Sequence, residues 1–134
     1  MIVENRDDYI NYRFQRAIES FDEALILAEN KRWNAVVNRL YYSSFYGVIA
    51  LLLKNNIETN THDGARTQFG LCFIKTGKIE KKYGKLFSKL FDYRQKGDYG
   101  DMYDYDETIV SPLISQVKDF IAELQKKVAE ITYR

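Results

Sequence analysis

The sequence predicts a single all-α domain over residues 1–134, an antiparallel bundle of four to five amphipathic helices. Apolar residues recur at three- and four-residue steps along most of the chain, which is the spacing of one helical face. The chain has one proline and no stretch with the alternation typical of a strand. With 134 residues, 46% of them hydrophobic, it has the length and apolar content of one domain.

Two long segments open the chain. The first predicted helix runs from Asp7 to Asn30 and the second from Trp33 to Asn55, and the short link between them favours an antiparallel hairpin. Small residues in the middle of the second helix would let a neighbouring helix approach closely. These residues are Ser43, Ser44 and Gly47.

Shorter helices complete the bundle. Thr61 is a suitable N-cap for a third helix over 62–75, and Gly77 stands where a helix end favours a left-handed residue. A fourth helix is predicted over 79–96.

The glycines Gly97 and Gly100 are expected to end the fourth helix. The last helix reaches the end of the chain, and its start has two alternatives. One is Ser111–Pro112 as the cap and first residue, and the other is an earlier start capped by Asp104 or Asp106.

Composition excludes several classes of protein. Lys plus Arg total 20 and Asp plus Glu total 19, and a net charge of +1 argues against a protein that coats polyanions. Cys72 is the only cysteine and His62 the only histidine, so we expect neither a disulfide nor a metal or cofactor site. The first residues lack a signal-peptide pattern, and the longest apolar stretch, 48–53, is too short to cross a bilayer. The expected location is cytoplasmic, without membrane contact.

An arginine continues the apolar stripe of the fourth helix. In helical steps, Leu90 is followed by Arg94 and then by Asp98, if the helix continues that far. A charge on a buried face needs a partner. One interpretation is a structural Arg94–Asp98 pair, although a cation placed before an anion is the weaker order in a helix. The other is a functional cluster that includes the adjacent Tyr99, and both stay open.

Lysines gather just before and along the fourth helix. Lys82, Lys85 and Lys89 fall on one predicted helical face together with Lys78. This face is either a solvated surface or a stripe that follows the phosphates of a nucleic acid. The next segment, 98–107, is acidic and rich in tyrosine, and could repel nucleic acid, pair with the lysines or dock a basic partner.

Three sequence motifs follow one another along the chain: NRLYYSSFY at 38–46, THDGARTQFG at 61–70 and LFDYRQKGDYG at 90–100. In order and spacing they resemble the HEPN domain family, most closely its small prokaryotic single-domain members. Those proteins show an N-R-x-Y-Y-x-x-F-Y-like string on the second helix, a T-H-x-G-like string at the start of the third and an R-Q-x-x-D-Y-like string closing the fourth. The likeness covers nearly the whole chain.

The resemblance implies a helical bundle that forms a homodimer, often near the fourth-helix motif. Many HEPN proteins are metal-independent ribonucleases in which an arginine and a following histidine form a composite site. Many others pair with a small nucleotidyltransferase as a toxin–antitoxin module, and that partner can transfer AMP to a motif tyrosine. Arg94 matches the family arginine, but Asp98 occupies the histidine position. Tyr99 is nearby, although its spacing from Arg94 does not clearly match the modified tyrosine.

The aspartate weakens the expectation of RNA cleavage. Metal-free cleavage needs a base for the 2′-hydroxyl and an acid for the leaving oxygen, and histidine serves as both near neutral pH. Asp98 could act as a base if its pKa were raised, but would be a poor acid unless well desolvated. Arg94 can still bind a phosphate in bidentate fashion.

Two further residues have alternative roles. His62, in the first turn of the third helix, either belongs to the helix cap or folds back to replace the missing motif histidine. Arg39, which the resemblance places near the motif helix together with Tyr42, is expected to form a structural ion pair. The carboxylates considered as its partner are Asp98, Asp92 and Glu19.

These observations lead to one leading prediction and two alternatives. The leading prediction is a homodimeric HEPN protein that acts as a binding or partner module for RNA or a nucleotide, as the toxin-side component of a toxin–antitoxin pair with a nucleotidyltransferase. The alternatives are an endoribonuclease toxin that uses Arg94 with Asp98, and a purely structural dimerising bundle. Besides Arg94, Asp98 and Tyr99, the candidate binding residues are Arg39, Tyr42, His62, Lys82, Lys85 and Lys89.

Overall fold

The computed structural model describes residues 5–99 and 104–130. The helices are α1 (Arg6–Glu29), α2 (Trp33–Lys54), α3 (His62–Phe69), α4 (Lys81–Tyr99) and α5 (Glu107–Ala129), and a π-helical turn, η2 (Gly70–Ile74), follows α3 directly. Within these ranges no strand occurs, which confirms the predicted all-α class.

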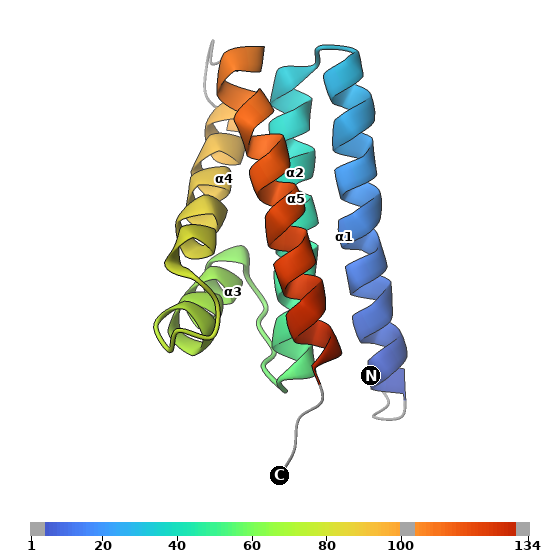
Figure 1. The fold of residues 1–134 in the computed structure, drawn as a ribbon, viewed down its shortest axis with the longest axis vertical. Helices are drawn as coiled ribbons and strands as arrows, with labels where there is room; N and C mark the ends of the chain where they lie inside the picture. Colours follow the sequence, from blue (N-terminus) through green and yellow to red (C-terminus); the bar gives the residue numbers. More distant parts are fainter. Residues whose placement is uncertain (1–4, 100–103, 131–134) are drawn as a thin grey trace.

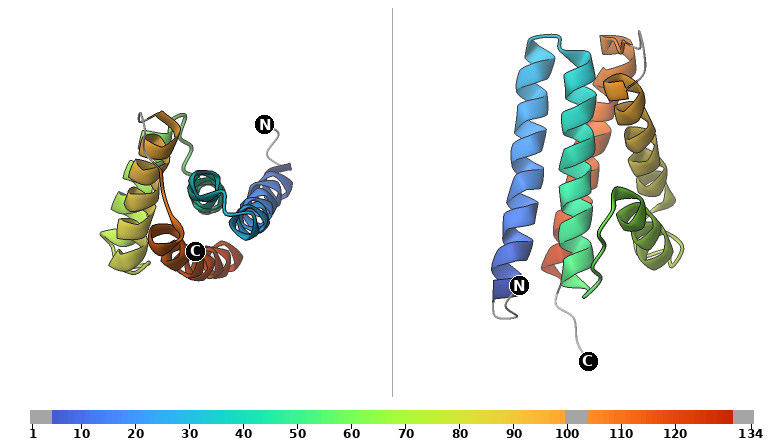
Figure 2. Two further views of the ribbon diagram at one scale, coloured as in Figure 1. Left: turned by 90° about the horizontal axis from the view of Figure 1, so that it is seen from above. Right: turned by 180° about the vertical axis from the view of Figure 1, so that it is seen from behind.

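The second helix is the centre of the bundle. It contacts α1, α3, α4 and α5, whereas α1 and α5 contact each other much less. α1 and α2 form the predicted antiparallel hairpin, and α5 runs alongside both (Figure 1). Viewed from above, α3 and α4 lie on the side of α2 opposite to α1 (Figure 2). The apolar faces of all five helices meet around α2 in one core.

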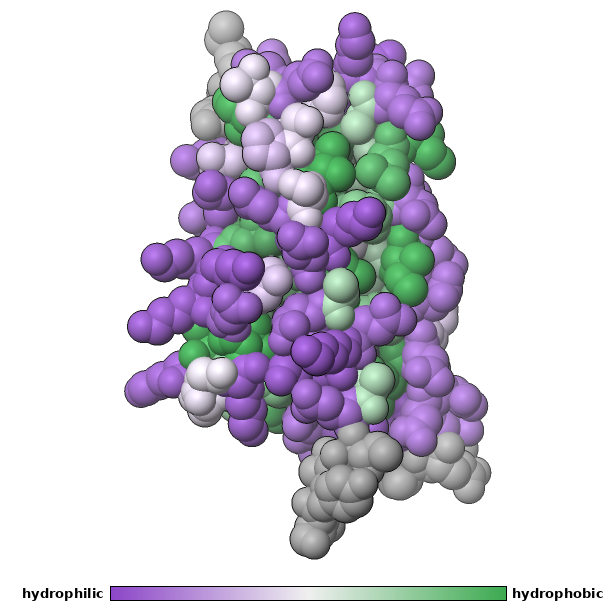
Figure 3. All heavy atoms as spheres, in the orientation of Figure 1, coloured by the Kyte–Doolittle hydropathy of each residue, from purple (hydrophilic) through white to green (hydrophobic). Residues whose placement is uncertain are grey.

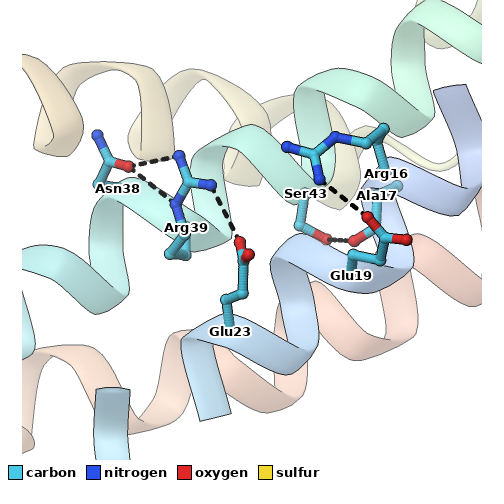
Figure 4. Close-up of polar contacts among 7 residues, drawn as sticks. All are labelled: Arg16, Ala17, Glu19, Glu23, Asn38, Arg39 and Ser43. Atoms are coloured by element: carbon cyan, nitrogen blue, oxygen red, sulfur yellow. Dashed lines mark hydrogen bonds and ion pairs between the residues drawn. The ribbon is translucent and has the colours of Figure 1, made fainter. Parts of the chain in front are cut away.

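Small residues in α2 allow the close helix packing that the sequence predicted. The buried Ser43 hydroxyl donates a 2.7 Å hydrogen bond to the carbonyl oxygen of Ala17 on α1 (Figure 4). A Cβ added at Gly47 would lie 2.9 Å from the Leu124 side chain on α5. Both contacts depend on the absence of a larger side chain at the crossing.

By length and composition alone, α2 passes a test for membrane-spanning helices. However, 67% of its most apolar window is buried inside the bundle, and its neighbours cover it on several sides. The apolar character of α2 is therefore that of a core helix.

The third helix starts as a regular α-helix and ends in a wider, π-helical turn. Thr61 caps α3 as predicted, because its hydroxyl oxygen accepts a 2.8 Å hydrogen bond from the Gly64 amide. The predicted helix over 62–75 then widens into the π-helical turn η2. Gly77 has φ 79°, the left-handed conformation expected after a helix end.

One expected boundary was wrong, and the structure decides one that the sequence left open. Gly97 does not end the fourth helix, which continues to Tyr99, while Gly100 lies outside the described residues. Pro112 lies inside α5, so the start at Ser111–Pro112 is excluded. α5 begins instead at the alternative cap Asp106, whose carboxylate accepts a 3.0 Å hydrogen bond from an amide in the first turn.

Candidate functional site

Arg94 lies on the buried face of α4, as the apolar stripe predicted, and is only 8% exposed. Its guanidinium carbon lies 5.0 Å from the ring centroid of Tyr41 and 5.5 Å from that of Tyr42. One Nη also donates a 3.3 Å hydrogen bond to the Tyr42 hydroxyl. Aromatic rings of α2 therefore position a buried cation, and the interaction of charge with ring faces offsets part of its desolvation.

Asp98 follows Arg94 by one turn because α4 continues through Gly97. One Oδ of Asp98 lies 3.8 Å from the Arg94 guanidinium, but the same oxygen accepts a shorter, 3.0 Å hydrogen bond from the Asn38 amide. The Asp98 side chain is 28% exposed and the Arg94 side chain 10%. The carboxylate is thus held at the solvent edge of the site, mainly by α2.

Gly97 allows this arrangement. A Cβ at Gly97 would lie 3.2 Å from the Tyr105 ring, so the glycine leaves room for that buried side chain. The Tyr105 hydroxyl donates a 2.9 Å hydrogen bond to the Tyr93 carbonyl, and its amide donates to the Asn34 side chain at 2.8 Å. Tyr105 is therefore held by hydrogen bonds to both α2 and α4.

Arg39 extends the network along α2. Its Nε and one Nη donate to the side-chain Oδ1 of Asn38 at 3.1 and 2.9 Å, and the other Nη donates to a Glu23 carboxylate oxygen at 3.1 Å (Figure 4). Arg39 does form an ion pair, but Asp98, Asp92 and Glu19 were the wrong partners, because Glu23 on α1 faces it. Arg39 connects to Asp98 only through Asn38. Its guanidinium also lies 5.3 Å from the Tyr42 ring centroid.

His62 also contacts Tyr41. Its Nδ1 is 2.7 Å from the Tyr41 hydroxyl, and its ring stacks on Phe45 with centroids 4.2 Å apart. Burial lowers the pKa of His62, and the nearby charge of Arg94 lowers it further. Burial likewise raises the pKa of the Tyr41 hydroxyl. At neutral pH both groups are uncharged, so Tyr41 connects a neutral imidazole to the Arg94 guanidinium.

A third arginine completes the cluster. The Arg66 guanidinium of α3 lies 4.2 Å from the Phe91 ring centroid, and Phe91 meets Tyr41 edge-on at 5.9 Å. Three arginines from three helices therefore pack on one group of rings. We call this the arginine–aromatic cluster, and it consists of Arg39, Arg66, Arg94, Tyr41, Tyr42 and Phe91.

The structure does not bring the three candidate lysines together. Lys85 and Lys89 line a groove between α3–η2 and α4. Lys82 instead lies on the opposite flank of α4, beside Asp119 of α5. Two further expectations concern Tyr99 and metal binding. The side chain of Tyr99 lies outside the described residues, and in the described ranges no three acidic, histidine or cysteine side chains are placed to hold a metal ion.

Sequence reasoning missed three members of this site. Asn38 lies between Arg39 and Asp98, and only its place in the NRLYY string could have indicated it. Tyr41 was not singled out in the sequence. Its ring is fully buried, but its hydroxyl reaches His62. Arg66 had no sequence signal, since its position depends on how α3 crosses α4.

Comparison with known proteins identifies the family of this chain. A family model described as the HEPN domain matches residues 10–128. A UPF0332 protein from Thermotoga maritima is 34% identical over 129 residues, which cover 96% of this chain and 98% of that protein. A protein from Methanocaldococcus jannaschii that is provisionally named a toxin is 36% identical over 115 residues, covering 86% of this chain and 85% of the relative. The chain therefore belongs to the HEPN domain family.

Proposed function

We propose that this chain is a toxin-like HEPN protein that binds RNA or a nucleotide at the arginine–aromatic cluster. The observation that carries the proposal is the packing of Arg39, Arg66 and Arg94 on one group of rings, within 4.2–5.5 Å of the ring centroids. Guanidinium groups bind phosphates through paired N–H donors, which suits the phosphates of an RNA or a nucleotide. Two relatives provisionally named toxins add support from the family.

Binding can be tested by fluorescence anisotropy with a labelled single-stranded RNA and with AMP as competitor. Loss of one charge-assisted hydrogen bond to phosphate corresponds to about 1.5–3 kcal/mol, so Arg94→Ala should weaken binding about 10- to 100-fold. Lys118→Ala is the matched control, because Lys118 is exposed on α5, away from the cluster. Equal affinity of Arg94→Ala and wild type, with folding intact, would overturn the proposal.

A second candidate function is metal-independent RNA cleavage, favoured by the contact between His62 and Tyr41. A neutral His62 could accept the proton of a 2′-hydroxyl whose oxygen then attacks the phosphorus. Arg94 would stabilise the added negative charge, and the proton would return to the departing 5′-oxygen. Degradation of total RNA by wild type, but not by His62→Asn or Arg94→Ala, is the expected result for a nuclease. Cleavage that survives both substitutions would point to a contaminant.

The proposal includes a homodimer and a nucleotidyltransferase partner, both implied by the family. Sedimentation velocity of the purified chain tests the dimer. Co-expression with a nucleotidyltransferase encoded next to it, followed by capture through a tag on either protein, tests the partner. Sedimentation as a monomer at all concentrations, or capture of one protein without the other, would remove the corresponding part of the proposal.

A further inference from the structure

A second surface, which shares only Arg66 with the arginine–aromatic cluster, has the features of a binding groove. It lies between α3–η2 and α4, with a volume of about 740 Å³. We call it the basic groove. Its basic residues are Arg66, Lys75, Lys81, Lys85, Lys89 and Lys96, and its apolar residues include Phe69, Ile74 and Phe87.

The floor of the basic groove is apolar and open. Two glycines among its residues add no side chain to the groove. A Cβ at Gly70 would meet nothing within 4 Å, and the nearest atoms to one at Gly84 would be those of Ile74, at 3.1–3.3 Å. The π-helical turn η2 carries Gly70 and Ile74 along one wall. Turns of this kind occur often at functional sites in helical proteins.

The rim of the basic groove carries six cations and a single acid, Asp92. Lys75, Lys81, Lys85 and Lys89 are exposed, and none forms an ion pair with a carboxylate of residues 5–99 and 104–130. On this side of the molecule, long hydrophilic side chains project outward and hydrophobic atoms show between them (Figure 3). A strong local charge on a nearly neutral chain is the pattern that attracts an oppositely charged partner.

We propose that the basic groove binds an acidic amphipathic helix of a partner protein. Apolar side chains of that helix would rest on the floor, and its carboxylates would meet the lysine rim. This proposal deepens the partner role in the proposed function and rests on that role, but it does not depend on RNA binding by Arg94.

Two other occupants fit the groove less well. Single-stranded RNA binds to exposed ring faces on which bases stack. The phenylalanines of the floor are each only 1% exposed, and the Tyr93 ring is already stacked on Tyr105 at 5.1 Å. A second copy docked symmetrically through the same groove would place the exposed lysines of the two copies against one another, which is repulsive.

The probe is a fluorescein-labelled synthetic helix of about 18 residues, with leucine at every third or fourth position and glutamate elsewhere. Anisotropy titrations of the full chain are compared in about 0.05 M and 0.3 M salt, because rim contacts are screened at the higher ionic strength. We expect saturable binding that weakens with salt. The double charge reversal Lys85→Glu with Lys89→Glu should weaken it about tenfold or more.

Three variants separate the contributions. Lys118→Glu with Lys126→Glu changes the net charge equally on α5, where both lysines are exposed, and should retain most of the binding. Gly70→Trp, at a position with open space around its Cβ, should fold and abolish binding even at low salt by filling the groove. Arg94→Ala should bind the peptide like wild type, so that failure of the RNA proposal and failure of this one give different results.

Several outcomes would overturn the inference. These are the absence of saturable peptide binding, an equal loss in the α5 control, and unaltered binding by Gly70→Trp. Displacement of the peptide by an RNA of the same length, with the RNA affinity lowered by the Lys85–Lys89 reversal, would instead assign the groove to nucleic acid. Self-association of wild type that this reversal abolishes would assign it to a second copy.

Discussion

Replacing Arg94 with methionine tests whether this residue holds the fold together or serves a ligand. Methionine keeps an unbranched stem of similar length and removes the charge. Two contacts with the rings of Tyr41 and Tyr42 are lost, and at a site this buried they are together worth about 2–4 kcal/mol. The 3.3 Å hydrogen bond to Tyr42 adds about 1 kcal/mol to the loss.

The gain comes from solvation. A guanidinium that is 8% exposed carries a desolvation cost of several kcal/mol, which methionine does not have. Asp98 is not left buried and unpaired, because its side chain is 28% exposed and keeps the 3.0 Å hydrogen bond from Asn38. The two sides nearly cancel, so Arg94→Met should change the free energy of unfolding by no more than about 1.5 kcal/mol.

The assay combines urea unfolding, followed by circular dichroism, with the RNA anisotropy titration. We expect near-wild-type stability together with at least a tenfold loss of RNA affinity. A loss of more than about 3 kcal/mol of stability would refute the reasoning, because it would show that Arg94 is needed for the fold. Unchanged stability with unchanged RNA binding would refute the functional assignment instead.

Three other predictions concern pH and packing. Burial lowers the pKa of His62 below its usual value of about 6.5. The stability contributed by the neutral imidazole is therefore complete above about pH 6.5 and declines as the pH falls toward the lowered pKa. His62→Gln should flatten this pH dependence of the free energy of unfolding in urea titrations at pH 5–7. Gly47→Val should cost about 1–3 kcal/mol in urea unfolding by forcing Leu124 away, whereas Gly47→Ala should cost less because the leucine tip can rotate. Asp106→Ala should lower the thermal midpoint through loss of about 1 kcal/mol from the helix cap, and an unchanged midpoint would contradict the capping role.

The helices could be predicted because their signal is local. Periodic apolar residues locate α1 and α2, and Thr61 carries the cap chemistry that starts α3. The errors arose where a long-range contact decided the outcome. Gly97 has a low intrinsic helix preference, yet α4 continues because Tyr105 packs against the space that the glycine leaves.

The candidate site could be predicted only in part, because some of its residues are placed by helical spacing and others by contacts between distant segments. The position of Arg94 on a buried stripe follows from helical spacing, and so does the place of Asp98 one turn later. The approach of His62 to Tyr41 depends on the path of residues 55–61, which no periodicity describes. Arg39 pairs with Glu23 because of the rotation of α1 against α2, which the sequence pattern leaves free within one or two residues.

The hydrogen bond between Tyr41 and His62 makes the site observable in solution. The chain contains one histidine, so its imidazole proton resonances are a single, unambiguous pair in an NMR spectrum. Any ligand that displaces the guanidinium from the Tyr41 ring changes the field at that imidazole, because Arg94 already influences its pKa. Occupancy of the arginine–aromatic cluster can thus be followed through His62 without a label, in the same titration that measures its protonation.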